Sequence, residues 1–144
     1  MTATNPFFDI SLLPYQAPHF DEINDDHYRP AFDEALRQKR ADIDAIVSQT
    51  AAPDFTNTVL ALEKSGAMLA RVSSVFFAMT SAHTNPYLQA LEEQFSTELA
   101  ALANDIWLND VLFARVESVW QDRAALDAES RRLVEETYQR FILA

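Results

Sequence analysis

The three histidines are the residues most able to bind a metal, but their neighbours do not match known metal motifs. A catalytic zinc helix uses H-E-x-x-H, and no histidine here precedes a glutamate. Di-iron bundles use Glu-x-x-His pairs, and no histidine here has a glutamate three residues before it. A structural or capping role is therefore favoured over ligation for His19 and His27, and a helix-end or surface position for His83. We predict no metal-binding residue.

Other catalytic constellations are equally scarce. Nucleophile elbows, phosphate loops and dinucleotide fingerprints need several glycines at fixed spacing, and Gly66 is the single glycine of the chain. The absence of cysteine excludes disulfides and thiolate metal sites. The carboxylate pairs Glu92/Glu93 and Glu135/Glu136 lie on polar helical faces, where solvation keeps them from acid–base work. We therefore predict no catalytic residue and no cofactor-binding residue.

Charge and termini point to the compartment. The net charge of −11 is spread along the chain, which argues against nucleic-acid and membrane partners. The first six residues carry no basic residue or apolar core of a signal peptide, and the strongly apolar run Val75–Met79 is too short to span a bilayer. With no cysteine, the usage suits a reducing compartment. We expect a cytoplasmic protein.

The elements that would position any site are helices. Scarce glycine and abundant Ala, Leu, Glu, Gln and Arg favour an all-α fold. At 144 residues the chain fits one domain: an extended arm rich in proline and aromatic residues over 1–20, then about five helices in an antiparallel bundle over 21–144. The helices are predicted at 26–49, 55–82, 86–106, about 110–121 and from 128 onward. Asp54, Asn85 and Asp127 are the predicted N-caps.

Apolar periodicity predicts which side chains are buried. In helix 55–82 the apolar residues follow the alternating spacing of three and four that is typical of a coiled-coil seam. Gly66 and Ser73 are small residues on this seam, and they suggest a close approach by a neighbouring helix. Asp33 and Arg37 are expected to form an outward ion pair. Trp107 and Trp120 are expected in the core or an interface. The predicted buried set is Phe32, Leu36, Ile43, Ile46, Val47, Val59, Leu62, Leu69, Phe76, Leu88, Leu91, Phe95, Leu99, Leu102, Ile106, Leu112, Phe113, Val116, Val119, Leu133, Val134, Tyr138 and Phe141.

The chain ends on the apolar run Phe141–Ala144, with no capping glycine and no polar tail. This pattern predicts an unfinished fold with bare apolar helix faces, which favours self-association through those faces.

Five segments, in order and spacing, resemble the N-terminal region of the thimet-oligopeptidase family of zinc metallopeptidases. They are Asn5–Phe7; Pro18–Ile23 with His27–Phe32; Phe55–Glu63; Ala103–Asn109 with Leu112–Val116; and Arg131–Phe141. The stretch Val75–Thr80 with Ala82–Asn85 is most similar to the bacterial peptidyl-dipeptidases, and the oligopeptidase A type is the close second.

The resemblance implies a larger two-lobed α-helical peptidase that removes C-terminal dipeptides from short peptides in a channel between its lobes. It implies a zinc site on an H-E-x-x-H helix, whose counterpart would lie beyond Ala144. This chain would then be inactive scaffold and channel wall, with the missing catalytic half as its partner. A stand-alone acidic helical interaction module is the alternative.

Overall fold

The computed structural model describes residues 7, 25–82 and 85–144, and these residues form helices and connections without a β-strand. The predicted all-α class is confirmed. The predicted arm over 1–20 lies outside the described residues, apart from Phe7. Among the described residues, no helix has both the length and the apolar character needed to cross a bilayer.

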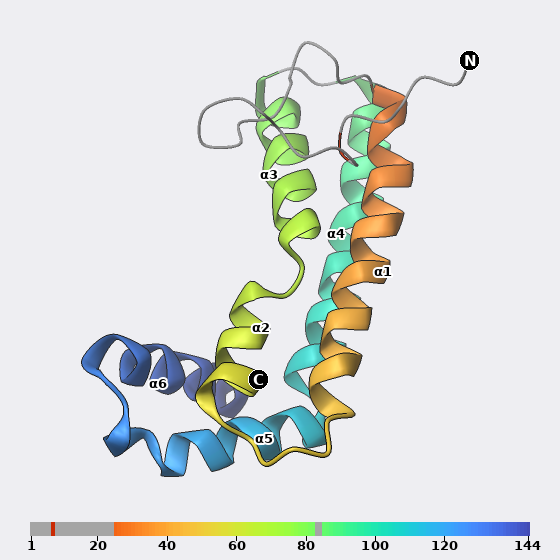
Figure 1. Ribbon diagram of the computed structural model, residues 1–144. Coiled ribbons are helices and arrows are strands. Elements are labelled where there is room, and N and C mark those ends of the chain that lie inside the picture. Colours follow the sequence, from red (N-terminus) through yellow and green to blue (C-terminus); the bar gives the residue numbers. More distant parts are fainter. Residues whose placement is uncertain (1–6, 8–24, 83–84) are drawn as a thin grey trace. The chain divides into compact units, whose positions relative to one another are not determined.

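Six α-helices and three irregular helical turns make up the described chain (Figure 1). A 3₁₀ turn, η4, leads directly into α1, and a π-helical turn, η5, leads directly into α2. In chain order the elements are η4 (Asp25–His27), α1 (Tyr28–Val47), η5 (Phe55–Leu60), α2 (Ala61–Lys64), α3 (Ala67–Ala82), α4 (Pro86–Trp107), α5 (Asp110–Gln121), η6 (Arg123–Ala125) and α6 (Ala128–Leu143).

Side-chain caps start the helices where the sequence predicted them. Asp54 and Asn57 form a reciprocal capping box, in which the backbone N–H of each residue donates to the side chain of the other. Asn85 accepts from the N–H of Leu88 at 2.8 Å, and Asp127 accepts from the N–H of Ser130 at 2.7 Å. These bonds satisfy N–H groups that have no partner inside the helix.

The prediction of one continuous helix over 55–82 is wrong. The backbone of Ser65 is extended, and Gly66 has φ +72°, so the chain leaves helical geometry between α2 and α3. The apolar spacing continues across this point, but spacing does not encode φ, and glycine reaches positive φ at little cost. The close approach expected at Gly66 is present: an added Cβ would lie 2.5 Å from Cδ of Lys39 on α1.

The chain divides into two compact units. Unit 1 comprises residues 1–39 and 66–97, and unit 2 comprises residues 40–65 and 98–144. The boundaries fall at the Ser65–Gly66 break and within α1 and α4. Nothing in the apolar periodicity of these two helices marked them.

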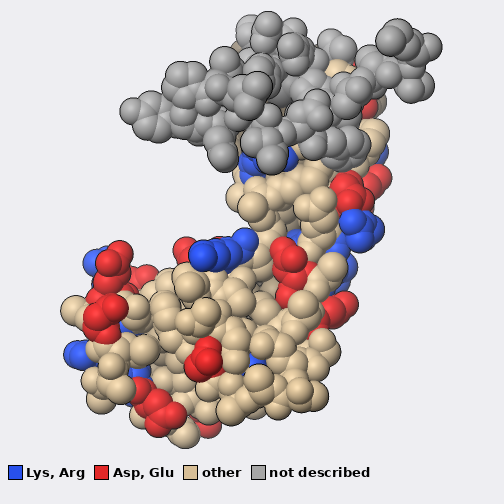
Figure 2. Space-filling view, viewed as in Figure 1, with Lys and Arg blue, Asp and Glu red and all other residues tan. Residues whose placement is uncertain are grey.

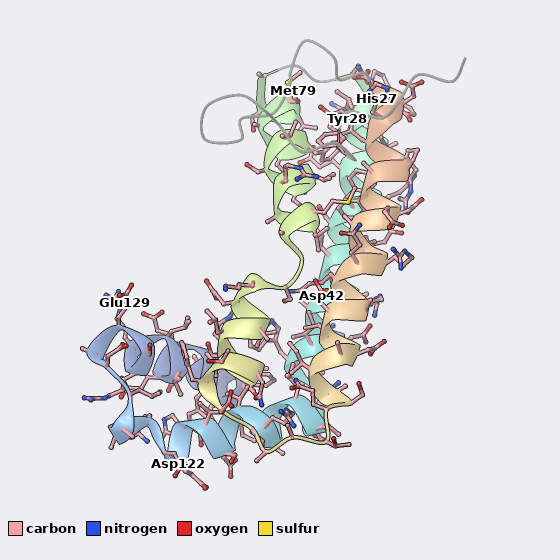
Figure 3. The ribbon with its side chains drawn as sticks, viewed as in Figure 1. His27, Tyr28, Asp42, Met79, Asp122 and Glu129 are labelled. Carbon is pink, nitrogen blue, oxygen red and sulfur yellow. The ribbon has the colours of Figure 1, made fainter. Side chains whose placement is uncertain are left out.

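Unit 1 has an aromatic core that joins α1, α3 and α4, which run alongside one another in Figure 1. The Phe32 and Phe95 rings stack with centroids 3.8 Å apart, and Phe76 meets Phe95 edge-on at 4.7 Å. Tyr28, labelled at the start of α1 in Figure 3, contacts Phe76 at 5.0 Å and Phe7 at 5.6 Å. All five rings are buried, so they hold the three helices together.

Unit 2 has an aliphatic core of Val59, Val119 and Val134, which joins η5, α5 and α6. Phe55 and Trp120 are half-buried and pack against this core, and Phe141 is buried elsewhere in the unit. Trp120 stacks on Tyr138 at 4.3 Å, and Trp107 meets Phe141 edge-on at 4.7 Å. Both tryptophans were expected in the core or an interface, and both are half-buried.

Most of the predicted buried residues are buried. The exceptions are half-buried: Leu36, Val47, Leu99, Phe113, Leu133 and Tyr138, with Trp120.

The predicted Asp33–Arg37 ion pair is wrong. Asp33 pairs with Arg29, and Arg37 pairs with Glu34, with Nε of Arg37 2.8 Å from Oε2 of Glu34. Helix geometry offers each side chain partners at both three and four residues' distance. Periodicity alone could not choose between them.

Candidate functional site

The residues able to bind a metal are not brought together within the part of the chain that the structure describes. There, no three His, Cys, Asp or Glu side chains gather in a group that could hold an ion. His27 lies half-exposed in η4, ahead of α1 (Figure 3). His19 and His83 lie outside the described residues.

The carboxylate pairs lie on the surface, as expected for Glu93, Glu135 and Glu136, while Glu92 is half-exposed. Glu135 lies 3.3 Å from Nε of Arg123, and Glu136 lies 3.0 Å from Nε of Arg132. On the face drawn in Figure 2, Lys and Arg lie scattered among Asp and Glu. Glu135 and Glu136 are therefore solvated and matched by cations, which does not favour acid–base work.

A groove in the described part of unit 1 lies between α1 and α3 and has a volume of about 860 Å³. Its apolar lining comes from Phe7, Pro30, Ala67 and Met68. This size and lining suit a few side chains of a bound segment. Among the described residues that line this groove there is no histidine, serine or threonine.

Every charged side chain on the wall of this groove has a partner. Asp33 pairs with Arg29, Glu34 pairs with Arg37, and Arg71 donates to the backbone carbonyl of Phe7. Hydrogen bonds from Arg37, and then from Gln38, lower the pKa of Glu34 to about 2. Glu34 is consequently charged at any physiological pH, and the groove carries balanced rather than unmet charge.

A smaller groove in unit 2 has a volume of about 470 Å³ and lies between the η5–α2 segment and α6. Phe55, Leu60 and Leu133 give it an apolar floor, and Glu63 and Glu129 stand at its rim. Glu136 and Arg132 complete the charged lining and pair with each other. This groove differs from the one in unit 1 because its charges do not balance.

A buried arginine holds the connection between α1 and η5 within unit 2. Arg115 is 8% exposed, and its guanidinium donates to the Ala51 carbonyl and to Oδ1 of Asn57, both at 3.2 Å. The side chain of Gln49 donates to the Asn57 carbonyl at 2.9 Å. Sequence reasoning missed this cluster, because a single arginine on an apolar helix gives no local signal that it is buried.

The chain is similar to part of two curated proteins that are named as peptidases. No family model matches it. It is 67% identical over 144 residues to a dipeptidyl carboxypeptidase of Salmonella typhimurium, a match that covers 99% of this chain and 21% of that protein. It is 64% identical over 146 residues to a dipeptidyl carboxypeptidase of Escherichia coli, covering 100% of this chain and 21% of that protein.

The chain thus spans about a fifth of the length of the curated relatives it matches. Identity this high along the whole chain confirms the resemblance drawn from the five segments. This chain is similar, from end to end, to one part of the bacterial dipeptidyl carboxypeptidases.

Proposed function

We propose that this chain is the N-terminal part of a cytoplasmic zinc peptidyl-dipeptidase, an enzyme that removes C-terminal dipeptides from short peptides. The observation that carries the proposal is the 67% identity along the whole chain to a dipeptidyl carboxypeptidase. The names of both relatives support this subtype over the oligopeptidase A type.

Within that enzyme, the chain acts as scaffold and channel wall rather than as the zinc site. The described residues do not fit a zinc ion, because their histidine, aspartate and glutamate side chains form no group of three. Zinc and the glutamate that activates water would be held by the part of the parent protein that this chain does not span. The contribution of this chain is to present helix faces and grooves at fixed positions.

Exposed apolar side chains in unit 2 support a partner within the parent protein. Leu108 and Val111 flank the α4–α5 junction and are 64% and 54% exposed, and Ile142 and Leu143 at the end of α6 are 51% and 76% exposed. Such residues favour contact with another apolar surface. We expect the isolated chain to self-associate or to bind a hydrophobic dye; a monodisperse chain that leaves the dye silent would contradict this part of the proposal.

A chimera tests the scaffold role. In the Salmonella relative, this chain would replace the segment that it matches, and hydrolysis of a blocked tripeptide would be measured. We expect the chimera to retain dipeptide release. A folded, zinc-loaded chimera without activity would contradict the proposal.

The isolated chain provides the complementary measurement. We expect neither stoichiometric zinc nor hydrolysis of the same tripeptide. Stoichiometric zinc together with turnover that a chelator abolishes would overturn the scaffold role. A genomic reading frame that continues past codon 144 to an H-E-x-x-H motif would support the enzyme over the stand-alone interaction module, and a stop codon with no downstream frame would support the module.

A further inference from the structure

The groove in unit 2 combines an apolar floor with an excess of negative charge, and we call it the acidic groove. The side chains used in the argument are those of Phe55, Leu60, Glu63, Glu129, Leu133 and Glu136. They come from two segments far apart in the sequence, the η5–α2 segment and α6, so the groove exists only in the folded unit.

Two of its three glutamates carry unmatched charge. Glu136 pairs with Arg132 at 3.0 Å. Glu63 on α2 and Glu129 on α6 form no ion pair with the residues that the structure describes, and both are exposed at the groove. Glu129 also lies in the first turn of α6, where the helix dipole stabilises a negatively charged carboxylate. Glu63 lies in the first turn of α2, but α2 continues directly from η5, whose N-cap is Asp54, so no helix begins at Glu63.

The floor is firmly supported. Phe55 and Leu133 are half-buried and pack against the aliphatic core of Val59, Val119 and Val134. Their remaining surface faces the groove, and covering it would remove apolar area from water. The floor therefore favours an apolar side chain, while the rim favours a cation.

We propose that the acidic groove binds a peptide segment that places an apolar side chain on the Phe55–Leu133 floor and a lysine or arginine between Glu63 and Glu129. Charge complementarity selects this occupant, because a neutral or acidic segment would leave both carboxylates unmatched. The groove of unit 1 provides a contrast within the same chain, since its charged side chains already have partners. The inference concerns the isolated chain and does not depend on the proposed function.

Matched peptides test the proposal. A short blocked peptide of alternating lysine and leucine would be titrated into the isolated chain by calorimetry, beside a counterpart in which glutamate replaces lysine. We expect the lysine peptide to bind, more tightly at low than at high salt, and the glutamate peptide not to bind. Equal binding of the two peptides, or no binding of the lysine peptide, would overturn the proposal.

Variants then locate the site. Glu63→Gln with Glu129→Gln is expected to weaken binding of the lysine peptide by about fivefold, the effect of losing two exposed ion pairs. Glu92→Gln with Glu93→Gln removes the same charge from α4 and is the matched control, expected to leave binding unchanged. Equal weakening by both double variants would show general charge attraction and overturn the groove as the site.

A floor variant checks the apolar half of the proposal. Leu133→Ala shortens one floor side chain and is expected to weaken binding of the lysine peptide, while circular dichroism verifies that helix content is retained. If this variant folds and binds as tightly as the parent chain, the proposed seating on the floor is overturned.

Discussion

The two units reach stability by different routes. In unit 1, five buried aromatic rings form one connected cluster, and the charged side chains around its groove are paired. In unit 2, three valines form a buried cluster, most of the aromatic residues are half-buried, and a buried arginine donates hydrogen bonds to neutral oxygens. Unit 1 therefore buries a cluster of large rings, whereas unit 2 buries mainly aliphatic side chains together with one arginine.

The two units also differ in how arginine side chains contact their aromatic rings. In unit 2, the guanidinium groups of Arg123 and Arg140 each lie 4.0 Å from the ring centroid of a tryptophan, Trp120 and Trp107 respectively. In unit 1, Arg29 lies farther from the Phe95 ring, at 5.2 Å, and also pairs with Asp33. Aromatic surface that unit 1 buries against other rings is, in unit 2, covered in part by cations.

The largest expected effect comes from removing a ring of unit 1. Phe95→Ala should lower the free energy of unfolding by about 3–5 kcal/mol, because Phe95 is 0% exposed and stacks on Phe32. Both tryptophans belong to unit 2, so tryptophan fluorescence reports that unit, whereas circular dichroism reports both. We expect the dichroism midpoint in urea to fall further than the fluorescence midpoint.

Phe113→Ala is the control in unit 2. Phe113 is half-buried beside Tyr138 and Phe141, so its removal should lower the free energy of unfolding by only about 1–2 kcal/mol. If Phe113→Ala destabilised the chain as much as Phe95→Ala, the contrast between the two cores would fail.

Unit 2 should be most sensitive to loss of its buried arginine. Arg115→Ala should lower the free energy of unfolding by about 2 kcal/mol, because the Ala51 carbonyl and the Asn57 side chain lose a donor. Arg115→Lys should not restore it, since an ammonium lacks the planar fork that reaches both oxygens. Arg140→Ala, on the exposed cation above Trp107, should cost less than about 1 kcal/mol in the same urea titration. Equal costs for Arg115 and Arg140 would contradict this account.

Replacing Gly66 at the boundary between the units tests the helix break, because the sign of the change in stability differs between a broken and a continuous helix. At φ +72°, Gly66→Ala should lower the free energy of unfolding by about 1–2 kcal/mol. In a continuous helix over 55–82 the same substitution would raise it by about 1 kcal/mol. Thermal denaturation distinguishes these outcomes, and combining Gly66→Ala with Lys39→Ala removes the steric part, leaving the cost of the backbone conformation. A stabilised Gly66→Ala variant would contradict the break.

We expect the smallest effect on stability from replacing the helix cap Asp127, and we expect it at acidic pH. The backbone N–H of Ser130 donates to the Asp127 carboxylate and is the main cause that holds its pKa below the usual 3.8. A lowered folded pKa means that the stabilising contribution is present above pH 3.8 and is lost as the pH falls through the folded pKa. Asp127→Asn keeps a neutral cap, so its melting temperature should match that of the parent chain at neutral pH. In acid, the melting temperature of the variant should fall by less than that of the parent chain. Identical acid profiles would contradict a contribution from this carboxylate.

Local signals in the sequence were enough to place the helices. Asn85 followed by Pro86, and Asp54 and Asp127 ahead of apolar periodic runs, are caps whose bonding partners lie within three residues. The Asp33–Arg37 pair failed because competing partners lie equally near along the helix. The burial of Arg115 could not be predicted, since its acceptors are 58 and 64 residues away.

The sequence by itself determined the all-α class, the helix starts and the resemblance to dipeptidyl carboxypeptidases, because composition, caps and apolar spacing are short-range properties. The tertiary structure decided the break at Gly66, the division into two units and the placing of Glu63 and Glu129 on the lining of one groove. Each of these depends on a backbone dihedral angle or on contacts between distant segments. The spacing of apolar residues along the chain specifies neither the angle nor the contacts.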